Sequence, residues 1–164
     1  MERDLTKYDV VICKELSPNC MAKEVRCVKI NDEILILKTA CNKKRYLNEK
    51  KIYLKLKDED FLPELKYIDD KNLILGLSDV GNSFLIYIYK NKQIYNKSLE
   101  KFNKEMKKIC DILLYKYGLY HNDLKYKNIC IDKSNKVRII DFEWCDTELK
   151  GRERKSFFIF KKMN

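Results

Sequence analysis

The segment from Tyr120 to Asp146 constrains the fold of this chain more than any other part of the sequence. It holds two short apolar runs, "NICID" and "VRIID", which are joined by the polar turn "KSNK". Short apolar runs on both sides of a polar turn predict a β-hairpin. Asn128 stands at the start of the first strand and Asp141 at the end of the second, so we expect their side chains to lie close together.

The residues around this hairpin limit the metal chemistry that the chain can support. His121 is the single histidine, and the seven cysteines are scattered with no C-x-x-C pair, so the sequence favours neither a multi-histidine site, a thiolate zinc site nor a disulfide framework. Cys130, within the first predicted strand, and Cys145, shortly after the second, are read as core residues. Carboxylate and amide oxygens remain as metal ligands, and these suit magnesium.

The first half of the chain predicts a small antiparallel sheet with one helix. Three alternating runs, of which the first begins at Tyr8, predict a three-stranded meander: "YDVVICKEL", "AKEVRCVKI" and "EILILKTA". Asn42 is expected to cap a helix from Lys43 to Leu56. The runs "LPELKYID" and "KNLILGLSDVG" predict two further strands, with Gly76 and Gly81 bracketing a connecting segment.

The second half predicts a long helix followed by the hairpin. Apolar residues keep a helical period from Ser98 to Tyr117, and Gly118 is a typical helix stop. With 164 residues, 45% of them hydrophobic, the chain is long enough for one domain or two small lobes. We therefore expect an α+β fold, in which residues 1–81 hold the sheet with one helix and residues 82–164 hold the long helix with the hairpin.

Two motifs in the second half resemble the protein-kinase-like superfamily. "HNDLKYKN" (121–128) matches the catalytic-loop pattern H-x-D-L-x-x-x-N, and "DFE" (141–143) stands at the position of the metal-binding D-F-G. Upstream, "ILILKTA" resembles the V-A-I-K strand, which makes Lys38 the phosphate-binding lysine, and Glu49 resembles its ion-pair partner on the following helix. The order of predicted elements is also similar to that family, so the resemblance implies a two-lobe kinase-like fold, with an N-lobe over residues 1–81 and a reduced helical C-lobe over 82–164.

The resemblance implies ATP and Mg²⁺ as cofactors. Lys38 would bind the α- and β-phosphates, with Glu49 fixing the lysine, and Asn128 and Asp141 would hold magnesium against the phosphates. Taken alone, Lys38 and Glu49 are also ordinary surface residues, and it is the joint pattern that favours a nucleotide site.

The same resemblance assigns the chemistry to the catalytic loop. Asp123 would accept the proton of the attacking hydroxyl, and Lys125 would neutralise charge near the transferred phosphate. His121 would act as a scaffold residue that bonds the backbone around the loop. The alternative reading of these polar residues is that they only cap turns.

Several positions depart from the family pattern. The first 75 residues contain no glycine, so the G-x-G-x-x-G lid is absent and the turn "SPNC" (17–20) stands in its place. Asn122 replaces the arginine of H-R-D, so control through a phosphorylated segment is not expected. Glu143 replaces the glycine of D-F-G, and either a third metal ligand or local rigidity would follow.

The sequence leaves the acceptor open. "HND" and "IDFE" are similar to choline and aminoglycoside kinases, whereas Lys125 is similar to protein serine/threonine kinases, which we favour. A short stretch follows Asp141, with no A-P-E element, so the C-lobe is expected to be truncated. "FFIF" (157–160) would seal that lobe or dock a protein partner. An inactive pseudokinase or decoy module is the main alternative to an enzyme, and a small-molecule kinase is the next.

The charge pattern argues against nucleic acid as a partner. The formal charge is +10, but 25 acidic residues are interleaved with 35 basic ones, which is typical of solvated helix faces. No apolar run approaches the roughly 20 residues that span a bilayer, and the N-terminus lacks the pattern of a signal peptide. We therefore expect a cytoplasmic protein without a membrane segment, whose partners are ATP and a protein or small-molecule hydroxyl acceptor.

Overall fold

The computed structural model describes residues 11–16, 22–30, 32–84 and 95–150. The chain divides into two compact units, the first of Met1–Glu59 with Pro63–Asp79 and the second of Asp60–Leu62 with Val80–Asn164. The identification of residues 1–81 and 82–164 as kinase N- and C-lobes stays a prediction. The expected positions of "SPNC" and "FFIF" lie outside the described residues.

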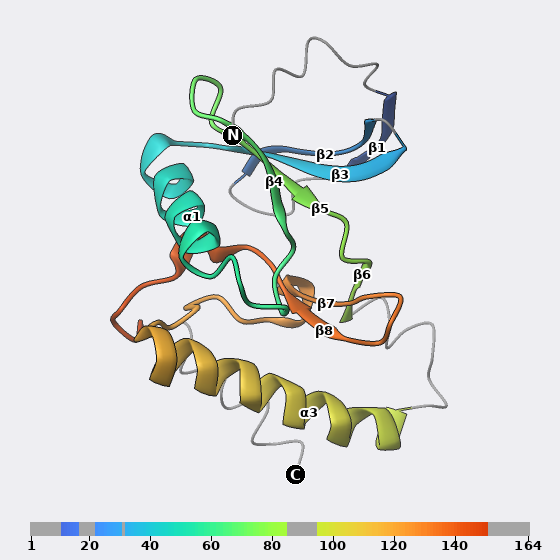
Figure 1. Cartoon of the computed structure of the whole chain (residues 1–164), viewed down its shortest axis with the longest axis vertical. Coiled ribbons are helices and arrows are strands. Elements are labelled where there is room, and N and C mark those ends of the chain that lie inside the picture. The colour runs from blue at the N-terminus through green and yellow to red at the C-terminus, as the bar shows by residue number, and fades with distance from the viewer. Residues whose placement is uncertain (1–10, 17–21, 31, 85–94, 151–164) are drawn as a thin grey trace. The chain divides into compact units, whose positions relative to one another are not determined.

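The first unit is built on a five-stranded antiparallel sheet. Its strands follow the order β1-β2-β3-β5-β4, as Figure 1 shows. Their bounds are β1 Val11–Leu16, β2 Ala22–Ile30, β3 Glu33–Ala40, β4 Leu65–Asp69 and β5 Ile74–Ser78. The predicted meander and the two further strands are therefore confirmed, except that residues 8–10 of the first run lie outside the described part.

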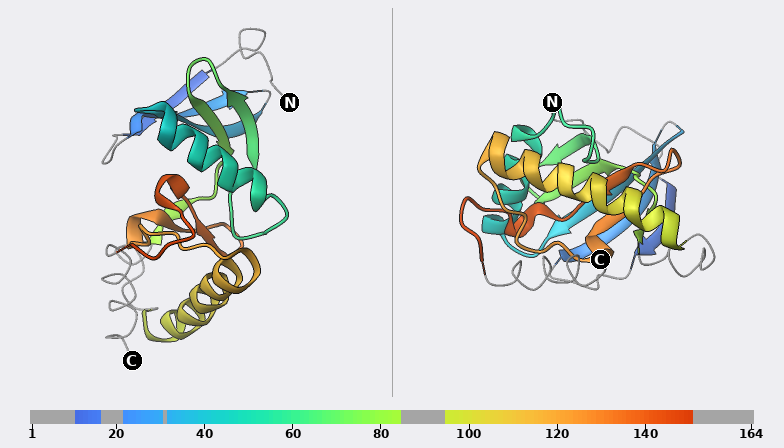
Figure 2. Two further views of the ribbon diagram at one scale, coloured as in Figure 1. Left: turned by 90° about the vertical axis from the view of Figure 1, so that its left-hand side faces the viewer. Right: turned by 90° about the horizontal axis from the view of Figure 1, so that it is seen from below.

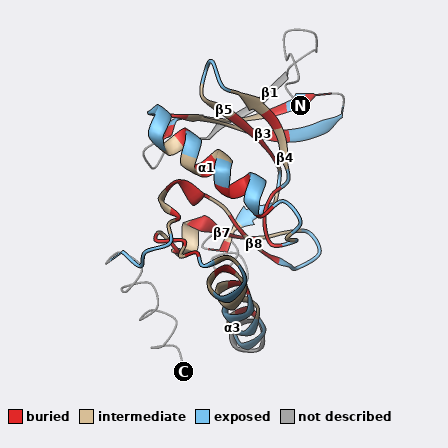
Figure 3. Cartoon of the chain, turned by 60° about the vertical axis from the view of Figure 1, so that its left-hand side comes forward, coloured by how far each residue is buried: buried red, intermediate tan, exposed pale blue. Residues whose placement is uncertain are grey.

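One helix, α1 (Lys43–Lys55), packs against β3 and β5 of this sheet (Figure 2). Asn42 caps it as predicted, because its side-chain oxygen accepts a hydrogen bond of 3.0 Å from the Arg45 amide, which stabilises a helix by about 1 kcal/mol. The helix has a buried and an exposed side (Figure 3). Its buried residues are Tyr46, Glu49, Ile52 and Tyr53.

The sheet also explains Gly76, which the sequence placed at the edge of a connecting segment. Gly76 instead lies within β5, where it pairs with Leu37 on one side and Tyr67 on the other. A Cβ atom at this position would lie 2.7 Å from the Cβ of Tyr67 and 3.1 Å from Cδ2 of Leu37. The glycine is therefore needed for close packing of neighbouring strands.

The second unit contains a long helix, α3 (Tyr95–Asp111), which continues into a π-helical turn, η2 (Ile112–Lys116). The buried side chains along it recur at helical spacing: Phe102, Met106, Ile109 and Leu113. Gly118 ends the helix as predicted, with a φ of 63° and its amide bonded to the Leu114 carbonyl at 2.9 Å. The loop that begins at Leu119 follows the end of this helix directly.

A three-stranded sheet follows the helix in this unit. Its order is β6-β7-β8, and the strands span Asn82–Ser83, Ile129–Ile131 and Val137–Ile139. The hairpin β7–β8 confirms the sequence prediction, whereas β6 was not predicted. Gly81 allows β6 to approach β7, because its φ is 85° and a Cβ would lie only 2.6 Å from the Ile131 carbonyl oxygen.

Three residues from the first half of the sequence complete the second unit. The Phe61 carbonyl accepts a hydrogen bond of 2.8 Å from the Ile139 amide on β8. Phe61 and Leu62 are both buried, and Asp60 pairs with Lys136 at 3.2 Å. The short segment Asp60–Leu62 therefore belongs to the hairpin sheet both by its backbone and by its side chains.

The α+β class is confirmed by these elements. Each unit combines an antiparallel sheet with one long helix. Within the described residues, none of the helices has the length and apolar character required to traverse a bilayer.

Candidate functional site

The loop between η2 and β7 is built around the side chain of His121, which is fully buried. The amide of Asp123 lies 3.3 Å from Nδ1, so Nδ1 is the acceptor and Nε2 carries the proton. Nε2 then donates to the Ile140 carbonyl at 3.0 Å, and the ring packs against Phe142 with the centroids 4.6 Å apart. The prediction that His121 bonds the backbone around the loop is confirmed.

Asp123 forms a polar cluster with two of the other predicted site residues. The Asn128 amide nitrogen donates to the Asp123 carboxylate at 3.0 Å and to the Asp123 carbonyl at 2.9 Å. The Lys125 ammonium contacts the second carboxylate oxygen at 2.8 Å. The Asp123 side chain is 12% exposed and that of Lys125 is 41% exposed. The carboxylate is therefore held in one orientation beside a cation that solvent can reach.

The hairpin brings Asn128 and Asp141 to neighbouring positions. Ile129 pairs with Ile139, and the Ile140 amide donates to the Asn128 carbonyl at 3.0 Å. Asp141 follows directly and has left-handed backbone angles, φ 71° and ψ 62°. Few residues besides glycine, asparagine and aspartate adopt this region readily, and such backbone positions cluster at functional sites.

Asn128 and Asp141 carry the kinds of oxygen atom that magnesium prefers as ligands. Both hydrogens of the Asn128 amide point to Asp123, so the amide oxygen is the part of that side chain suited to a cation. Asp141 supplies a carboxylate, and the residue as a whole is 9% exposed. Magnesium is commonly held by one or two protein ligands together with phosphate and water oxygens. Across the described part of the chain, no three histidine, cysteine or acidic side chains gather as a metal site.

The turn of the hairpin is held by Asp132. Its carboxylate accepts hydrogen bonds from the Ser134 amide at 2.8 Å, the Lys136 amide at 3.0 Å and the Arg138 guanidinium at 2.9 Å. Burial acts to raise the pKa of Asp132, but the hydrogen bonds outweigh it and lower this pKa to about 2. The ionised carboxylate thus stabilises the hairpin that carries the predicted magnesium ligands.

We expect the second unit to lose stability as the pH falls from about 4 to about 2. The folded-state pKa of Asp132, about 2, lies below its ordinary value of 3.8, so the ionised group stabilises the fold above pH 3.8 and this contribution disappears as the pH falls through about 2. It is worth at most about 2 kcal/mol at neutral pH. Urea unfolding at a series of pH values, followed by the fluorescence of the single tryptophan, Trp144, measures this loss. In Asp132→Asn the contribution of residue 132 to the acid dependence should be absent.

Asp111→Asn is the matched control for this experiment. Asp111 lies on α3 in the same unit and pairs with Lys107 at the surface, where ion pairs contribute little. An acid dependence that is the same in wild type and in Asp132→Asn would contradict the assignment.

The first unit holds the remaining predicted site residues, Lys38 on β3 and Glu49 on α1. The Lys38 ammonium lies 2.8 Å and 3.0 Å from the two carboxylate oxygens of Glu49. Their side chains are 11% and 2% exposed. The ion pair that the resemblance implied is therefore present and largely buried, and its action on phosphates stays a prediction.

A second set of contacts fastens α1 to the turn between β4 and β5. The Tyr46 hydroxyl donates to the Asp70 carboxylate at 2.6 Å, and the Lys50 ammonium contacts both Asp70 oxygens at 2.7 Å. The hydrogen bond from Lys50 is the main cause that lowers the pKa of Asp70. Because Tyr46 and Lys50 flank Glu49 on the helix, these contacts hold Glu49 in place.

Sequence reasoning gave no structural role to Asn122. The structure buries Asn122 to 1% exposure and pairs both ends of its amide with the backbone of residues 148 and 150. The residue type was a signal in the sequence, since asparagine tolerates the left-handed backbone that the structure shows here, with a φ of 63°. Glu143 is also buried, at 6% exposure, in the short turn η4 (Phe142–Trp144). Cys130 and Cys145 are buried, as predicted.

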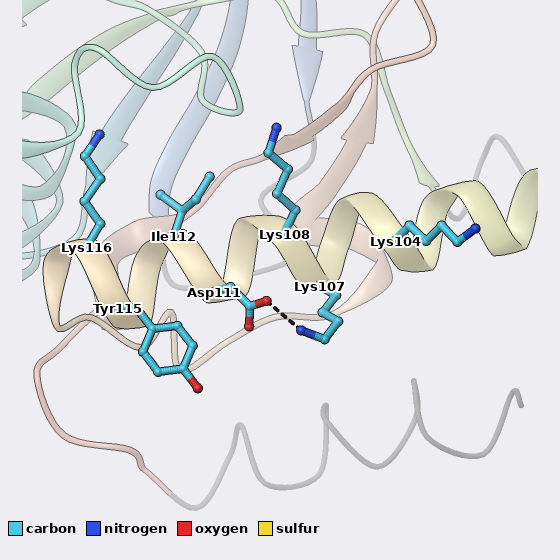
Figure 4. A pocket seen from close by; sticks show the side chains of 7 residues that line it. All are labelled: Lys104, Lys107, Lys108, Asp111, Ile112, Tyr115 and Lys116. Atoms are coloured by element: carbon cyan, nitrogen blue, oxygen red, sulfur yellow. Dashed lines mark hydrogen bonds and ion pairs between the residues drawn. The ribbon is translucent and has the colours of Figure 1, made fainter.

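A shallow groove on the second unit lies apart from all of these residues. Its described lining comes from α3 and η2 alone, and Figure 4 shows the Lys107–Asp111 ion pair along it, with the two groups 2.6 Å apart. The lining residues are Lys104, Lys107, Lys108, Asp111, Ile112, Tyr115 and Lys116. None of the predicted site residues belongs to it, so the groove plays no part in the candidate site.

Comparison with known proteins bears on these observations. No family model matches the chain. The chain is similar to the "Putative serine/threonine-protein kinase 040L" of Invertebrate iridescent virus 3, with 32% identity over 117 residues. The similarity covers 58% of this chain and 35% of that relative, so the chain spans about a third of the relative's length. The match confirms what the motifs predicted, that this chain resembles the protein-kinase-like superfamily.

Proposed function

We propose that this chain is an ATP- and magnesium-dependent phosphotransferase of the protein-kinase-like superfamily. The observation that carries the proposal is that the Asn128 amide orients the Asp123 carboxylate, while the backbone bond between Ile140 and Asn128 brings Asp141 to a neighbouring position on the hairpin. Phosphate transfer needs charge neutralised and an acceptor held in line, and little covalent chemistry from the protein.

Each residue then has a task. Asn128 and Asp141 would hold magnesium, which neutralises phosphate charge when it is bound. Lys38, oriented by Glu49, would bind phosphate oxygens of ATP. These tasks account for polar groups that are otherwise costly to bury, since an ion pair inside a protein seldom adds stability by itself.

Asp123 would accept the proton of the attacking hydroxyl. Its carboxylate is fixed by hydrogen bonds from Asn128 and Lys125, which limits reorientation when the acceptor binds. Lys125 would also stabilise charge on the phosphate during transfer. Its position beside Asp123 supports serine or threonine hydroxyls of a protein as the acceptor, and the name of the viral relative points the same way.

Binding of Mg-ATP is expected to raise the melting temperature of the wild-type chain by several degrees. A ligand at a hundred times its Kd stabilises a protein by about 2.7 kcal/mol. Asp141→Asn should lose most of this shift, because it removes the carboxylate while asparagine still tolerates the left-handed backbone of residue 141. Thermal unfolding with ATP, with and without Mg²⁺, measures the effect.

Asp111→Asn, on the surface of α3, should keep the full shift and serves as the control. No shift in the wild type at millimolar Mg-ATP would contradict the proposal and favour a binding module that does not use nucleotide. Where binding is found, transfer of radiolabelled phosphate to a generic basic protein or to choline distinguishes a protein kinase from a small-molecule kinase.

A further inference from the structure

We propose that Asn122 is a positioning residue, which clamps the segment Asp146–Lys150 to the catalytic loop through uncharged hydrogen bonds and so fixes the backbone at Asp123 without any phosphorylated residue. The clamp itself is a property of the second unit, and only its effect on phosphate transfer rests on the proposed function.

The side chain of Asn122 makes the pair of hydrogen bonds that the backbone of a neighbouring β-strand would make. Its amide nitrogen donates to the Glu148 carbonyl at 2.9 Å, and its amide oxygen accepts from the Lys150 amide at 2.7 Å. A carbonyl and an amide two residues apart are the groups that a neighbouring strand would pair with. The side chain is 1% exposed, so these bonds are shielded from water.

An antiparallel backbone bridge between Tyr120 and Asp146 lies just before these side-chain hydrogen bonds. The Tyr120 amide donates to the Asp146 carbonyl at 2.8 Å, and the Asp146 amide donates to the Tyr120 carbonyl at 3.0 Å. Residues 120 and 122 therefore hold residues 146 to 150 at two successive points. The loop and the segment form a short ladder although residues 147–150 are not in a regular strand.

Asparagine combines the two properties that this position requires. The φ of 63° at residue 122 turns the chain just before Asp123, and most side chains are strained there. Glycine would tolerate the angle but would lose both side-chain bonds. Aspartate would tolerate it and could accept from Lys150, but it has no hydrogen for the Glu148 carbonyl when ionised.

The carboxylate of Asp146 at the start of the segment is neutralised by Lys150 at its end. The Asp146 carboxylate accepts from the Thr147 amide at 2.7 Å and from the Lys150 ammonium at 2.5 Å. The hydrogen bond from Lys150 is the main cause that lowers the pKa of Asp146. Because Asn122 meets backbone groups only, an added phosphate is not needed to complete its hydrogen bonds. The loop should therefore be ordered without phosphorylation of any residue.

Amide hydrogen exchange tests the clamp in the full chain without nucleotide. In Asn122→Gly, which keeps the left-handed backbone, the Lys150 amide should exchange at least about tenfold faster than in wild type. Asn122→Asp should lie between the two. Asn135→Gly is the matched control, because Asn135 is exposed and also has a left-handed φ, 60°, in the same unit. It should leave exchange at Lys150 unchanged.

Phosphate transfer to a generic basic protein tests the positioning. Asn122→Gly should lower kcat roughly 10- to 100-fold with little change in the KM for Mg-ATP, since misplacing a reacting group by about 1 Å costs up to about 10²-fold. Asn122→Asp should restore part of the rate. Treatment of the wild type with phosphatase should leave transfer unchanged.

Equal exchange at Lys150 in wild type and Asn122→Gly would overturn the clamp. Faster exchange with unaltered kcat, or loss of transfer after phosphatase treatment, would overturn the positioning role. A wild type that binds no Mg-ATP would instead contradict the proposed function. Hydrogen exchange at the Lys150 amide would then decide by itself whether Asn122 holds the segment.

Discussion

Asp123→Asn is expected to lower phosphate transfer about 10²- to 10⁴-fold, the usual contribution of a positioned general base. The change removes the group proposed to take the proton of the acceptor hydroxyl. The side-chain oxygen of the new asparagine can still accept the hydrogen bond from the Asn128 amide, and Asp141 is unchanged, so the Mg-ATP-dependent rise in melting temperature should remain. Initial rates with radiolabelled ATP and a generic basic protein, beside thermal unfolding, measure the two properties separately.

Two further variants make this result interpretable. Asp111→Asn on the outer face of α3 should transfer phosphate at the wild-type rate. Lys125→Ala keeps the carboxylate and removes its cationic neighbour, 2.8 Å away, so it should lower the rate by less than Asp123→Asn does. Transfer by Asp123→Asn at the wild-type rate would show that another group accepts the proton.

Glu49→Ala is expected to destabilise the first unit by about 3–5 kcal/mol, because it leaves the Lys38 ammonium charged, largely buried and without its carboxylate. Urea unfolding followed by circular dichroism measures this loss. Trp144 fluorescence should report less of it, since the single tryptophan lies in the second unit.

A surface ion pair in the same unit provides the control. Glu64 lies 2.5 Å from Lys66, but its side chain is 72% exposed, so Glu64→Ala should cost at most about 1 kcal/mol. The double variant Lys38→Met with Glu49→Leu should recover part of the stability, because it removes both charges and keeps apolar volume. A cost for Glu49→Ala no larger than that of Glu64→Ala would refute a buried, tightly coupled pair.

Local patterns predicted the regular elements well. The alternation of β2 and β3, the cap at Asn42 and the stop at Gly118 each depend on neighbouring residues, so they could be read without knowing the fold. The hairpin that carries Asn128 and Asp141 could be predicted in the same way, because the polar residues that form its turn are adjacent in the sequence.

Long-range pairing limited what the sequence could predict. Asp70 meets Tyr46 and Lys50 from another element, and no local signal marks it as the anchor of α1. Gly76 was misplaced because the need for glycine comes from Tyr67 on the adjacent strand. The role of Asn122 likewise appears only when residues 148 and 150 return to the loop.

Because the second unit includes Asp60–Leu62, it is formed from two separate stretches of the sequence. A fragment that begins at residue 80 would deprive the Ile139 amide of its Phe61 acceptor and would lack the buried side chains of Phe61 and Leu62. Separate expression of this half therefore requires a circular permutation, or a grafted copy of those three residues, before its chemistry can be studied in isolation.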